Sequence, residues 1–332
     1  MCPARIRGVG KRELSGASMI VQELRAIQDR CGYLPESELR ALAERINVPL
    51  YRLHAVASFF PHYRLNPPPA VDVKVCRDMA CHLAGARWLR QGLTALAQEI
   101  GGGQVLVEGV SCLGQCDGAP AVSINDHVYH GLSQQELRAR IRTALAKEPL
   151  PHQRADRSPR GWRIDPYASQ PRYEAVQKLV ADRDIDGVLK RLETATLRGL
   201  GGAGFPTHRK WSAVRAAPAP KYIVCNADES EPGTFKDREI LRRTPHLVVE
   251  GMVLAGLVTG ADRGFIYVRH EFEEEIESLQ HAIDQARNQR FCGANILGSE
   301  LSFPVEVYVS PGGYICGEES ALLEAIDRKS VV

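Results

Sequence analysis

Four of the nine cysteines form two close pairs, and this spacing is the first feature of the chain that could support chemistry. Cys76 and Cys81 make a C-x4-C pair, and Cys112 and Cys116 make a C-x3-C pair. Each pair follows a β-branched segment that is typical of a strand, VDVKVC or VLVEGVSC. Loops at the ends of neighbouring strands can converge, and four thiolates are the ligands that an iron–sulfur cluster requires. The pattern therefore favours a metal centre at these cysteines.

Other uses of these cysteines stay open at this stage. Structural zinc more often uses C-x2-C to C-x4-C knuckles, and buried, unreactive thiols are a further alternative. A thioredoxin redox pair is disfavoured because the spacing is not C-x-x-C. The odd number of cysteines, in a chain without a visible secretory signal, argues against a disulfide framework. Cys116 precedes the turn Asp117–Pro120, whose backbone N–H groups we expect to face the sulfurs.

A glycine-rich stretch, Leu197–Trp211, is the second feature. Its sequence LRGLGGAGFPTHRKW holds four glycines within six positions. A backbone without Cβ atoms can turn with positive φ and present successive N–H groups, which form a concavity for an anion. Lys210 follows as a point charge for a phosphate. A tight turn without a ligand is the alternative interpretation, because a glycine motif alone is weak evidence.

Two acidic stretches favour a ligand site. Asn226–Arg238, NADESEPGTFKDR, follows a predicted strand, and the pair Glu318–Glu319 precedes a predicted helix. Carboxylates can accept hydrogen bonds from the N–H and O–H groups of a ligand's ring or ribose. A solvated turn or helix capping explains one such residue but not both loops together. The cysteines beside these stretches, Cys225 and Cys316, are interpreted as packing residues.

The composition excludes some classes of protein. The 332-residue chain has a net charge of +2 and 44% hydrophobic residues, which is an ordinary globular composition for about two domains. A nearly neutral charge argues against a large nucleic-acid footprint. No apolar run reaches the ~20 residues of a membrane helix, and the basic N-terminus has no apolar signal core. We therefore expect a cytoplasmic protein without direct membrane insertion.

The alternation of helical and strand patterns predicts an α/β fold. Helical periodicity indicates a small bundle, in which His54 and His62 are interpreted as structural or surface residues. A strand–helix–strand–hairpin–helix order, typical of a thioredoxin-like domain, comes next. Strands and helices then alternate, which favours a mostly parallel, Rossmann-like sheet. The expected parts are a tail (1–18), the helical bundle (19–66), a thioredoxin-like domain (67–147), a linker (148–172) and a second α/β domain (173–332).

The segment CRDMAC…CLGQCDGAPA resembles the thioredoxin-like 2Fe–2S subunit of complex I and its relatives. The helical bundle before it also fits that family, so the resemblance covers about residues 19–147. It implies a single 2Fe–2S cluster bound by Cys76, Cys81, Cys112 and Cys116.

The three stretches of the second half resemble the FMN- and NADH-binding subunit of complex I and of related NAD-dependent formate dehydrogenases and hydrogenases, over roughly residues 173–326. The resemblance implies an electron-transfer (diaphorase) chain, in which NADH gives a hydride to FMN and single electrons continue to the 2Fe–2S cluster. Phe205 is expected to stack near the nicotinamide or adenine, and Glu231 to lie beside the flavin as the catalytic residue that tunes charge. The residues implied to bind FMN or NAD(H) are Gly199, Gly201, Gly202, Ala203, Gly204, Phe205, Lys210, Asn226, Asp228, Glu229, Ser230, Glu231, Tyr314, Gly317, Glu318 and Glu319.

The presence of both modules in one chain resembles the β subunit of soluble NAD-dependent formate dehydrogenases, and hydrogenase diaphorase subunits share the order. Leu200 favours the formate dehydrogenase form, since many complex I chains have a basic residue at this position. His208 departs from the pattern, because the family usually has glycine there. The implied partners are a large catalytic subunit and a further iron–sulfur subunit. The alternatives are a complex I subunit, a hydrogenase diaphorase and a non-catalytic, cluster-binding assembly module.

The end of the chain departs from the family pattern. Family members continue with a ubiquitin-like domain and a helical bundle that carries a C-x2-C-x2-C…C site for a 4Fe–4S cluster. Nothing after Ile326 matches, and C-x2-C-x2-C does not occur in this sequence. We therefore expect a C-terminally truncated member, with an incomplete second domain, that uses 2Fe–2S, FMN and NAD(H) without the 4Fe–4S site.

Overall fold

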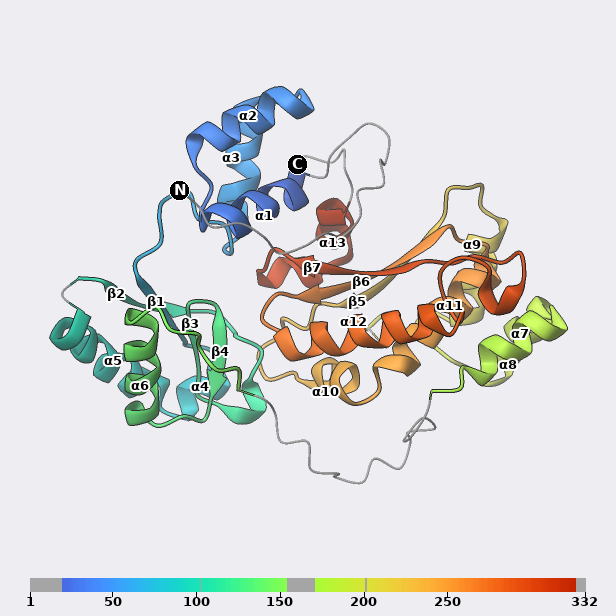
Figure 1. Cartoon of the computed structure of the whole chain (residues 1–332). Helices are drawn as coiled ribbons and strands as arrows, with labels where there is room; N and C mark the ends of the chain where they lie inside the picture. The colour runs from blue at the N-terminus through green and yellow to red at the C-terminus, as the bar shows by residue number, and fades with distance from the viewer. Residues whose placement is uncertain (1–19, 102, 154–170, 201, 327–332) are drawn as a thin grey trace. The chain divides into compact units, whose positions relative to one another are not determined.

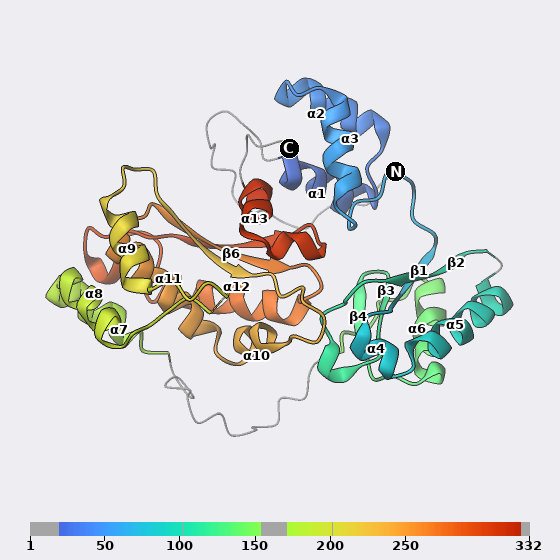
Figure 2. The same cartoon turned by 180° about the vertical axis from the view of Figure 1, so that it is seen from behind.

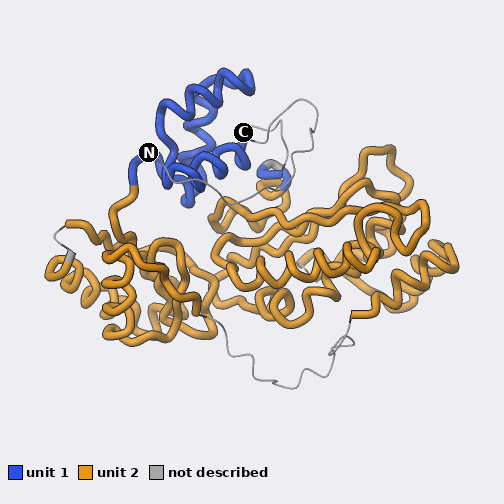
Figure 3. Tube along the Cα trace, viewed as in Figure 1, with its two compact units in different colours: residues 1–67, 323–332 blue, residues 68–322 orange. Residues whose placement is uncertain are grey.

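The computed structural model describes residues 20–101, 103–153, 171–200 and 202–326. The expected tail, most of the expected linker, Gly201 and the last six residues lie outside this range. The chain forms two compact units, which Figure 3 distinguishes by colour. One consists of residues 1–67 and 323–332, and the other of residues 68–322. Each unit is described by itself below.

The smaller unit begins with three helices, in the region where the sequence predicts a bundle. They are α1 (Ile20–Cys31), α2 (Glu36–Ile46) and α3 (Leu50–Phe59). Leu24, Leu39 and Leu53 contribute one fully buried side chain from each helix, so their apolar stripes form a common core. His54 Nε2 lies 2.9 Å from Glu36 Oε2 at the surface, which agrees with a structural role for this histidine.

The larger unit begins with a four-stranded sheet in the order β2-β1-β3-β4. The pair β1–β2 is parallel, and the pairs β1–β3 and β3–β4 are antiparallel, which is a thioredoxin-like arrangement. Because β1 and β2 are parallel, the loops that follow them leave the same edge of the sheet. The elements are β1 (Val71–Cys76), α4 (Met79–Leu83), α5 (Ala86–Gly101), β2 (Val105–Val110), η1 (Cys116–Gly118), β3 (Ala121–Ile124), β4 (His127–His130) and α6 (Gln134–Leu145).

The same unit contains a second sheet of three parallel strands in the order β5-β6-β7. Helices α11 and α12 lie on one face of this sheet in both Figure 1 and Figure 2. The connections from β5 to β6 and from β6 to β7 both lead to the next strand in the same direction across the sheet. Two right-handed crossovers of this kind place their helices on the same face. The elements are α7 (Glu174–Asp182), α8 (Ile185–Thr194), α9 (Thr207–Ala216), β5 (Tyr222–Ala227), α10 (Lys236–Arg243), α11 (Pro245–Thr259), β6 (Arg263–Arg269), α12 (Glu273–Asn288), η2 (Ile296–Gly298), β7 (Val305–Ser310) and η3 (Tyr314–Gly317). Helix α13 (Glu319–Ile326) begins in this unit, and its residues from Leu323 onward belong to the smaller unit.

Helix α11 packs tightly because of one glycine. A Cβ atom on Gly256 would lie 2.3 Å from the ring of the buried Phe303, so the helix and this ring approach each other only if residue 256 has no side chain. No helix in the described ranges is both long and apolar enough to cross a membrane.

Candidate cluster and flavin sites

The structure brings the four predicted ligand cysteines together at one edge of the first sheet. Cys76 ends β1 and Cys81 lies in α4, whereas Cys112 and Cys116 belong to the loop after β2. The Sγ atoms of Cys112 and Cys116 are 3.4 Å apart, and Cys76 is close enough to exchange hydrogen bonds with Cys81 and Cys112. All four are free thiols.

The thiols affect one another's protonation. The neighbouring Cys112 thiol lowers the pKa of Cys76, but Cys81 and burial outweigh this effect and raise that pKa to about 11. Burial raises the pKa of Cys116 to about 11 as well, and Cys76 together with burial raises the pKa of Cys112. The hydrogen bond with Cys76 lowers the pKa of Cys81. Because the other three pKa values are raised, a compensating cation is needed before all four groups can be thiolates together. This is the behaviour of a donor set that is completed by a metal.

Backbone N–H groups point at three of the sulfurs. Gly114 N lies 3.4 Å from Cys112 Sγ, and Ala121 N lies 3.4 Å from Cys81 Sγ. Gly233 N, more than a hundred residues further along the chain, lies 3.2 Å from Cys116 Sγ. The sequence predicts donors from the turn Asp117–Pro120, but these three lie outside it, and Gly118 N donates to Gln115 O at 3.1 Å instead. Gly114 and Ala121 flank the turn, and Gly233 comes from the second α/β region. Such donors stabilise thiolate charge and adjust the potential of an iron–sulfur centre.

The acidic loop, residues 226–238, connects β5 to α10 and carries most of the polar residues predicted to meet a flavin. Ser230 Oγ donates to Asp228 Oδ2 at 2.6 Å, and Asn226 Nδ2 donates to the carbonyl of Gly317 at 2.9 Å. Asp228 Oδ1 is buried without a hydrogen-bond partner, and burial raises the pKa of this carboxyl. A buried acceptor without a donor matches a ligand that supplies an N–H or O–H group.

Two of the predicted ligand residues, Glu229 and Glu318, accept hydrogen bonds from the N-terminal N–H groups of helices. The carboxylate of Glu229 is buried and accepts hydrogen bonds from Asp237 N at 2.9 Å and Arg238 N at 3.2 Å, at the start of α10. Glu318 accepts from Ser320 N at 2.9 Å and Ala321 N at 3.1 Å, and these donors lower the pKa of Glu318. Both carboxylates therefore satisfy helix N-termini. Their contacts with a cofactor stay a prediction, as does that of the exposed Glu319.

Glu231 and Tyr314 meet at the surface. Tyr314 Oη donates a 2.6 Å hydrogen bond to Glu231 Oε2, which raises the pKa of Tyr314. Gly317 approaches the acidic loop so closely that a Cβ there would lie 3.1 Å from the carbonyl oxygen of Asp228. The acidic loop follows β5 and the residues 314–319 follow β7, so both lie at the carboxyl ends of parallel strands. That edge is where open α/β sheets bind ligands.

Hydrogen bonds join the two ends of the glycine loop, residues 197–206, and free space surrounds its described glycines Gly202 and Gly204. Gly199 N donates to Phe205 O at 3.0 Å, and Arg198 Nη1 donates to Gly204 O at 3.0 Å. Gly202 and Gly204 have φ of 113° and 60°, and a Cβ on either would meet no atom within 4 Å. These two glycines are therefore needed for the backbone conformation, and space is left on the loop for a ligand. Ala203, the half-exposed Phe205 and His208 line an adjoining cavity of about 480 Å³.

The structure joins two of the three predicted ligand stretches. Hydrogen bonds connect the acidic loop with residues 314–319, whereas those of the described part of the glycine loop stay within residues 192–210. Lys210 is exposed on α9. Its role at a phosphate, like that of the whole glycine loop at a cofactor, stays a prediction.

Known proteins resemble both halves of the chain. Residues 8–144 match the family model of the thioredoxin-like [2Fe-2S] ferredoxin, and residues 192–332 match that of the Nuo51 FMN-binding domain. The chain contains both domains. The NADH-quinone oxidoreductase of Aquifex aeolicus has a subunit that is 44% identical over 175 residues, which are 52% of this chain and 40% of that protein. The mitochondrial NADH dehydrogenase [ubiquinone] flavoprotein 1 of Dictyostelium discoideum is 46% identical over 155 residues, which are 46% of this chain and 32% of that protein.

A solved structure matches both domains at once. A chain of an NAD+-reducing [NiFe]-hydrogenase in the air-oxidised state superposes with a TM-score of 0.76 and 30% identity, over 93% of this chain and 54% of that chain. The chain thus spans about half of this structural relative and two fifths or less of the two curated relatives above.

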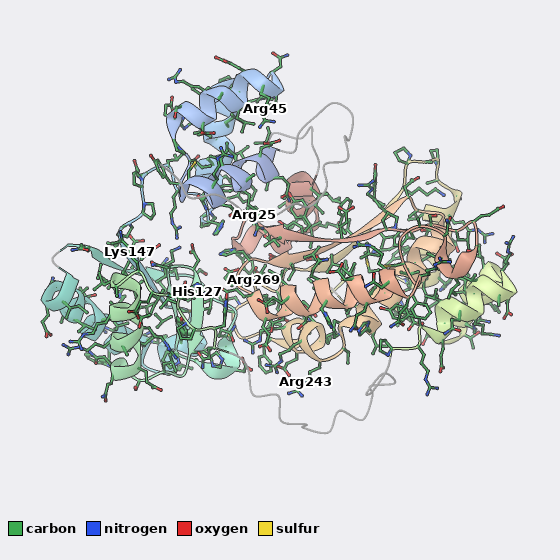
Figure 4. The ribbon with its side chains drawn as sticks, in the orientation of Figure 1. Arg25, Arg45, His127, Lys147, Arg243 and Arg269 are labelled. Atoms are coloured by element: carbon green, nitrogen blue, oxygen red, sulfur yellow. The ribbon has the colours of Figure 1, made fainter. Side chains whose placement is uncertain are left out.

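Two buried arginines of the FMN-binding domain contact the cysteine loop of the ferredoxin domain. Arg269, labelled in Figure 4, ends β6 and donates to the carbonyls of Cys112 at 2.6 Å and Glu229 at 2.7 Å. Arg238 starts α10 and donates to the carbonyl of Gly114 at 2.7 Å and to the Asp117 carboxylate. Both side chains are only 4% exposed. The arginines therefore fix the loop that carries Cys112 and Cys116 against the acidic loop.

The sequence does not predict a role for these two arginines. The sequence does contain a sign of the role of Arg269, because this cation stands at the carboxyl end of the apolar predicted strand GFIYVRH. A charge buried at such a position needs hydrogen-bond or ion-pair partners. No comparable signal marks Arg238, because its acceptors lie more than 120 residues away in the chain.

Proposed function

We propose that this chain is the electron-transfer part of an NADH dehydrogenase-type oxidoreductase that connects NAD(H), FMN and a 2Fe–2S cluster. One observation carries the proposal. The acidic loop contributes to both candidate sites, because it carries Asp228 and Glu231, which we assign to the flavin, while the N–H of Gly233 points at Cys116 Sγ. A flavin that exchanges electrons in pairs with NADH and singly with an iron–sulfur centre supplies this chemistry when bound.

The residues of the chain would bind and orient these groups. Cys76, Cys81, Cys112 and Cys116 would hold the cluster, with the N–H groups of Gly114, Ala121 and Gly233 as donors to the sulfurs. Asp228 Oδ1 would accept a hydrogen bond from the flavin, because it is buried and no group of the described residues lies within hydrogen-bond distance of it. The glycine loop and Lys210 would hold phosphate groups. Glu231, oriented by Tyr314, would set the charge where the nicotinamide approaches.

The proposed partners are the other subunits of a multi-subunit dehydrogenase. The match to an NAD+-reducing [NiFe]-hydrogenase chain includes both domains in the same order, which favours a hydrogenase-type diaphorase over a complex I subunit. The β subunit of an NAD-dependent formate dehydrogenase is the more specific proposal from the sequence, and it rests on the fused order and on Leu200. The eight described cysteines are free, in agreement with the proposed cytoplasmic location.

Reconstitution tests the proposal. The purified chain is loaded with iron, sulfide and FMN, and NADH-dependent reduction of ferricyanide is measured together with the absorption and electron paramagnetic resonance of the cluster. We expect turnover and a reduced 2Fe–2S signal, and Cys76→Ser should abolish that signal. A chain that binds the cluster without turnover is an assembly module, and a colourless chain that contains zinc in place of iron is a zinc-stabilised binding protein. Either result overturns the proposal.

A further inference from the structure

A large, histidine-rich cavity borders the cysteine loop and the end of the acidic loop, because Asp117 and Arg238 are among its lining residues. None of the ligand cysteines and none of the residues predicted to bind FMN or NAD(H) is among the described residues that line it. Its volume is about 880 Å³, and its walls come from the first sheet, from α10 and from α12 of the larger unit. Five histidines line it, namely His127, His130, His152, His246 and His281. The function proposed above uses none of them.

Three side chains of this cavity direct ligand atoms at one point. His127, labelled in Figure 4, begins β4, His152 lies in the segment after α6, and Glu273 begins α12. Glu273 Oε2 lies 2.9 Å from His152 Nδ1 and 3.5 Å from His127 Nδ1. One ligand atom from each residue lies within 4.8 Å of the other two. We propose that His127, His152 and Glu273 bind a divalent transition-metal ion of the zinc class.

The distances fit such an ion. A tetrahedral zinc centre with ligands at about 2.0 Å separates neighbouring ligand atoms by about 3.3 Å. The two measured nitrogen–oxygen distances lie on either side of that value, so an ion needs only small adjustments of the side chains. Two imidazoles and a carboxylate are also a ligand set that suits zinc and similar metals and leaves a fourth position for water.

The protein alone satisfies these side chains poorly. Glu273 Oε2 faces two imidazole nitrogens, but only His152 Nδ1, at 2.9 Å, is within ordinary hydrogen-bond distance. His127 Nδ1 is 3.5 Å from that oxygen and has no closer hydrogen-bond partner among the described residues. The rings of His127 and His152 meet edge to face with centroids 4.9 Å apart, which keeps both nitrogens near Glu273. The neighbouring Glu274 and Glu275 also line the cavity and favour the approach of a cation.

The ion would connect three separate segments of the chain. His127 and His152 flank α6, and Glu273 follows the strand that Arg269 ends. Metal at this point would therefore hold the edge of the ferredoxin domain against the first turn of α12, in addition to the arginine contacts. We expect the bound ion to stabilise the folded chain by linkage.

Zinc binding to the cluster-loaded chain tests this inference. Because iron then occupies the cysteines, equilibrium dialysis against buffered Zn²⁺, followed by elemental analysis of zinc and iron, counts sites outside the cluster. We expect one zinc per chain, and His127→Ala and His152→Ala should each weaken it more than tenfold, because each removes a direct ligand and even the loss of a group that only orients a ligand costs about tenfold. His281→Ala is the matched control, because this exposed histidine lines the same cavity outside the three-residue group.

A second measurement does not depend on the stoichiometry. Zinc should raise the midpoint of thermal unfolding of the unaltered chain and of the His281→Ala variant, but not that of His152→Ala. Equal zinc binding in the unaltered chain and the two ligand variants, at unchanged iron content, would overturn the inference. NADH oxidation is not part of the test, so its outcome is independent of the proposed electron-transfer function.

Discussion

Asp228 combines a cost in stability with a role in binding. Its buried carboxyl has one oxygen without a partner, and burial raises its pKa. Between the unfolded pKa and this raised value, the folded state binds more protons than the unfolded state, so the contribution of Asp228 to stability falls as pH rises. At neutral pH the unpaired group destabilises the free protein by about 1–3 kcal/mol.

Asp228→Asn should therefore stabilise the FMN-free protein by about 1 kcal/mol at neutral pH, because it removes the buried charge. The gain should vanish below the unfolded pKa, where the native carboxyl is protonated. Urea unfolding at several pH values measures both effects, with the exposed Asp182→Asn as the control. The same variant should bind FMN more weakly, and unchanged FMN affinity would contradict the assignment of Asp228 to the flavin site.

We assign to Glu231 the adjustment of the electrostatic environment of the flavin and the nicotinamide. Because its carboxylate lies at the surface beside Tyr314, Glu231→Gln should leave the fold and FMN binding intact. We expect kcat/KM for NADH to fall about tenfold, which is ~1.4 kcal/mol of transition-state stabilisation, and the flavin potential to shift. Steady-state kinetics and a potentiometric titration measure these changes. If both stay as in the unaltered protein, Glu231 has no such role.

At the scale of elements, β6 carries a matched pair of arginines at its two ends. Arg269 is buried and bonded to Glu271, Cys112 and Glu229, whereas Arg263 pairs with the exposed Glu306 at 3.8 Å. Arg269→Gln should cost about 3–5 kcal/mol, because it leaves the buried Glu271 carboxylate without its arginine, with the His270 imidazole, 3.3 Å away, as its remaining ion-pair partner. Arg263→Gln should cost less than about 1 kcal/mol.

Denaturant unfolding of the two arginine variants checks these values. If Arg269 also positions the cysteine loop, its substitution by Lys, which retains the charge but not the planar fork, should alter the electron paramagnetic resonance of the reduced cluster. Equal destabilisation by the substitutions at 263 and 269 would show that the bonds of Arg269 to the loop carry no free energy.

Helix α11 offers two glycines with opposite expectations. Gly256→Ala places a Cβ 2.3 Å from the Phe303 ring, and we expect a net loss of about 1–2 kcal/mol, because overpacking exceeds the gain in helix propensity. Gly251→Ala meets no atom within 4 Å and should stabilise the protein by up to about 1 kcal/mol. Thermal unfolding of both variants is the measurement. If both substitutions stabilise the protein, helix propensity and not packing governs this helix, and if Gly251→Ala destabilises it, the expectation from propensity is wrong.

The sequence predicts most of the long elements, because they have a strong period or a β-branched run. The predicted strands of the second domain and the long helices around Val253 and Ile283 agree with β5, β6, β7, α11 and α12. Helices α9 and α10 are missed, since THRKWSAVRA and KDREILRR directly continue motifs that were interpreted as ligand loops. Residues in such motifs can begin a helix and serve a site at once, as Arg238 shows.

The candidate sites show the same limit. The convergence of the four cysteines follows from two parallel strands and could be predicted. The capping role of Glu229 and the bonds of Arg238 and Arg269 could not, because they depend on contacts between segments far apart in sequence. A pattern within one segment identifies which residues can bind, but the fold decides whether a carboxylate faces a cofactor or a helix end.

For the molecule as a whole, the acidic loop makes the two cofactor sites thermodynamically dependent on each other. It contacts Cys116 through Gly233 N and carries the predicted flavin residues, while Arg238 at its end is bonded to the cysteine loop. Ligands that order the same loop bind cooperatively, with coupling of typically 1–3 kcal/mol. The affinity of the cluster-free chain for FMN should thus be at least about fivefold lower than that of the cluster-loaded chain.

Reciprocity makes this prediction testable from both sides. The FMN dissociation constant, from quenching of flavin fluorescence, should rise in Cys116→Ser, whereas Cys31→Ser, which alters a cysteine outside the centre, should leave it unchanged. In the other direction, saturating FMN should lower the equilibrium loss of iron to a chelator by the same factor, because the coupling free energy is shared by both ligands. If FMN affinity is the same with and without the cluster, the acidic loop carries no coupling free energy between the two sites. The contacts of Gly233 and Arg238 then have a structural role only.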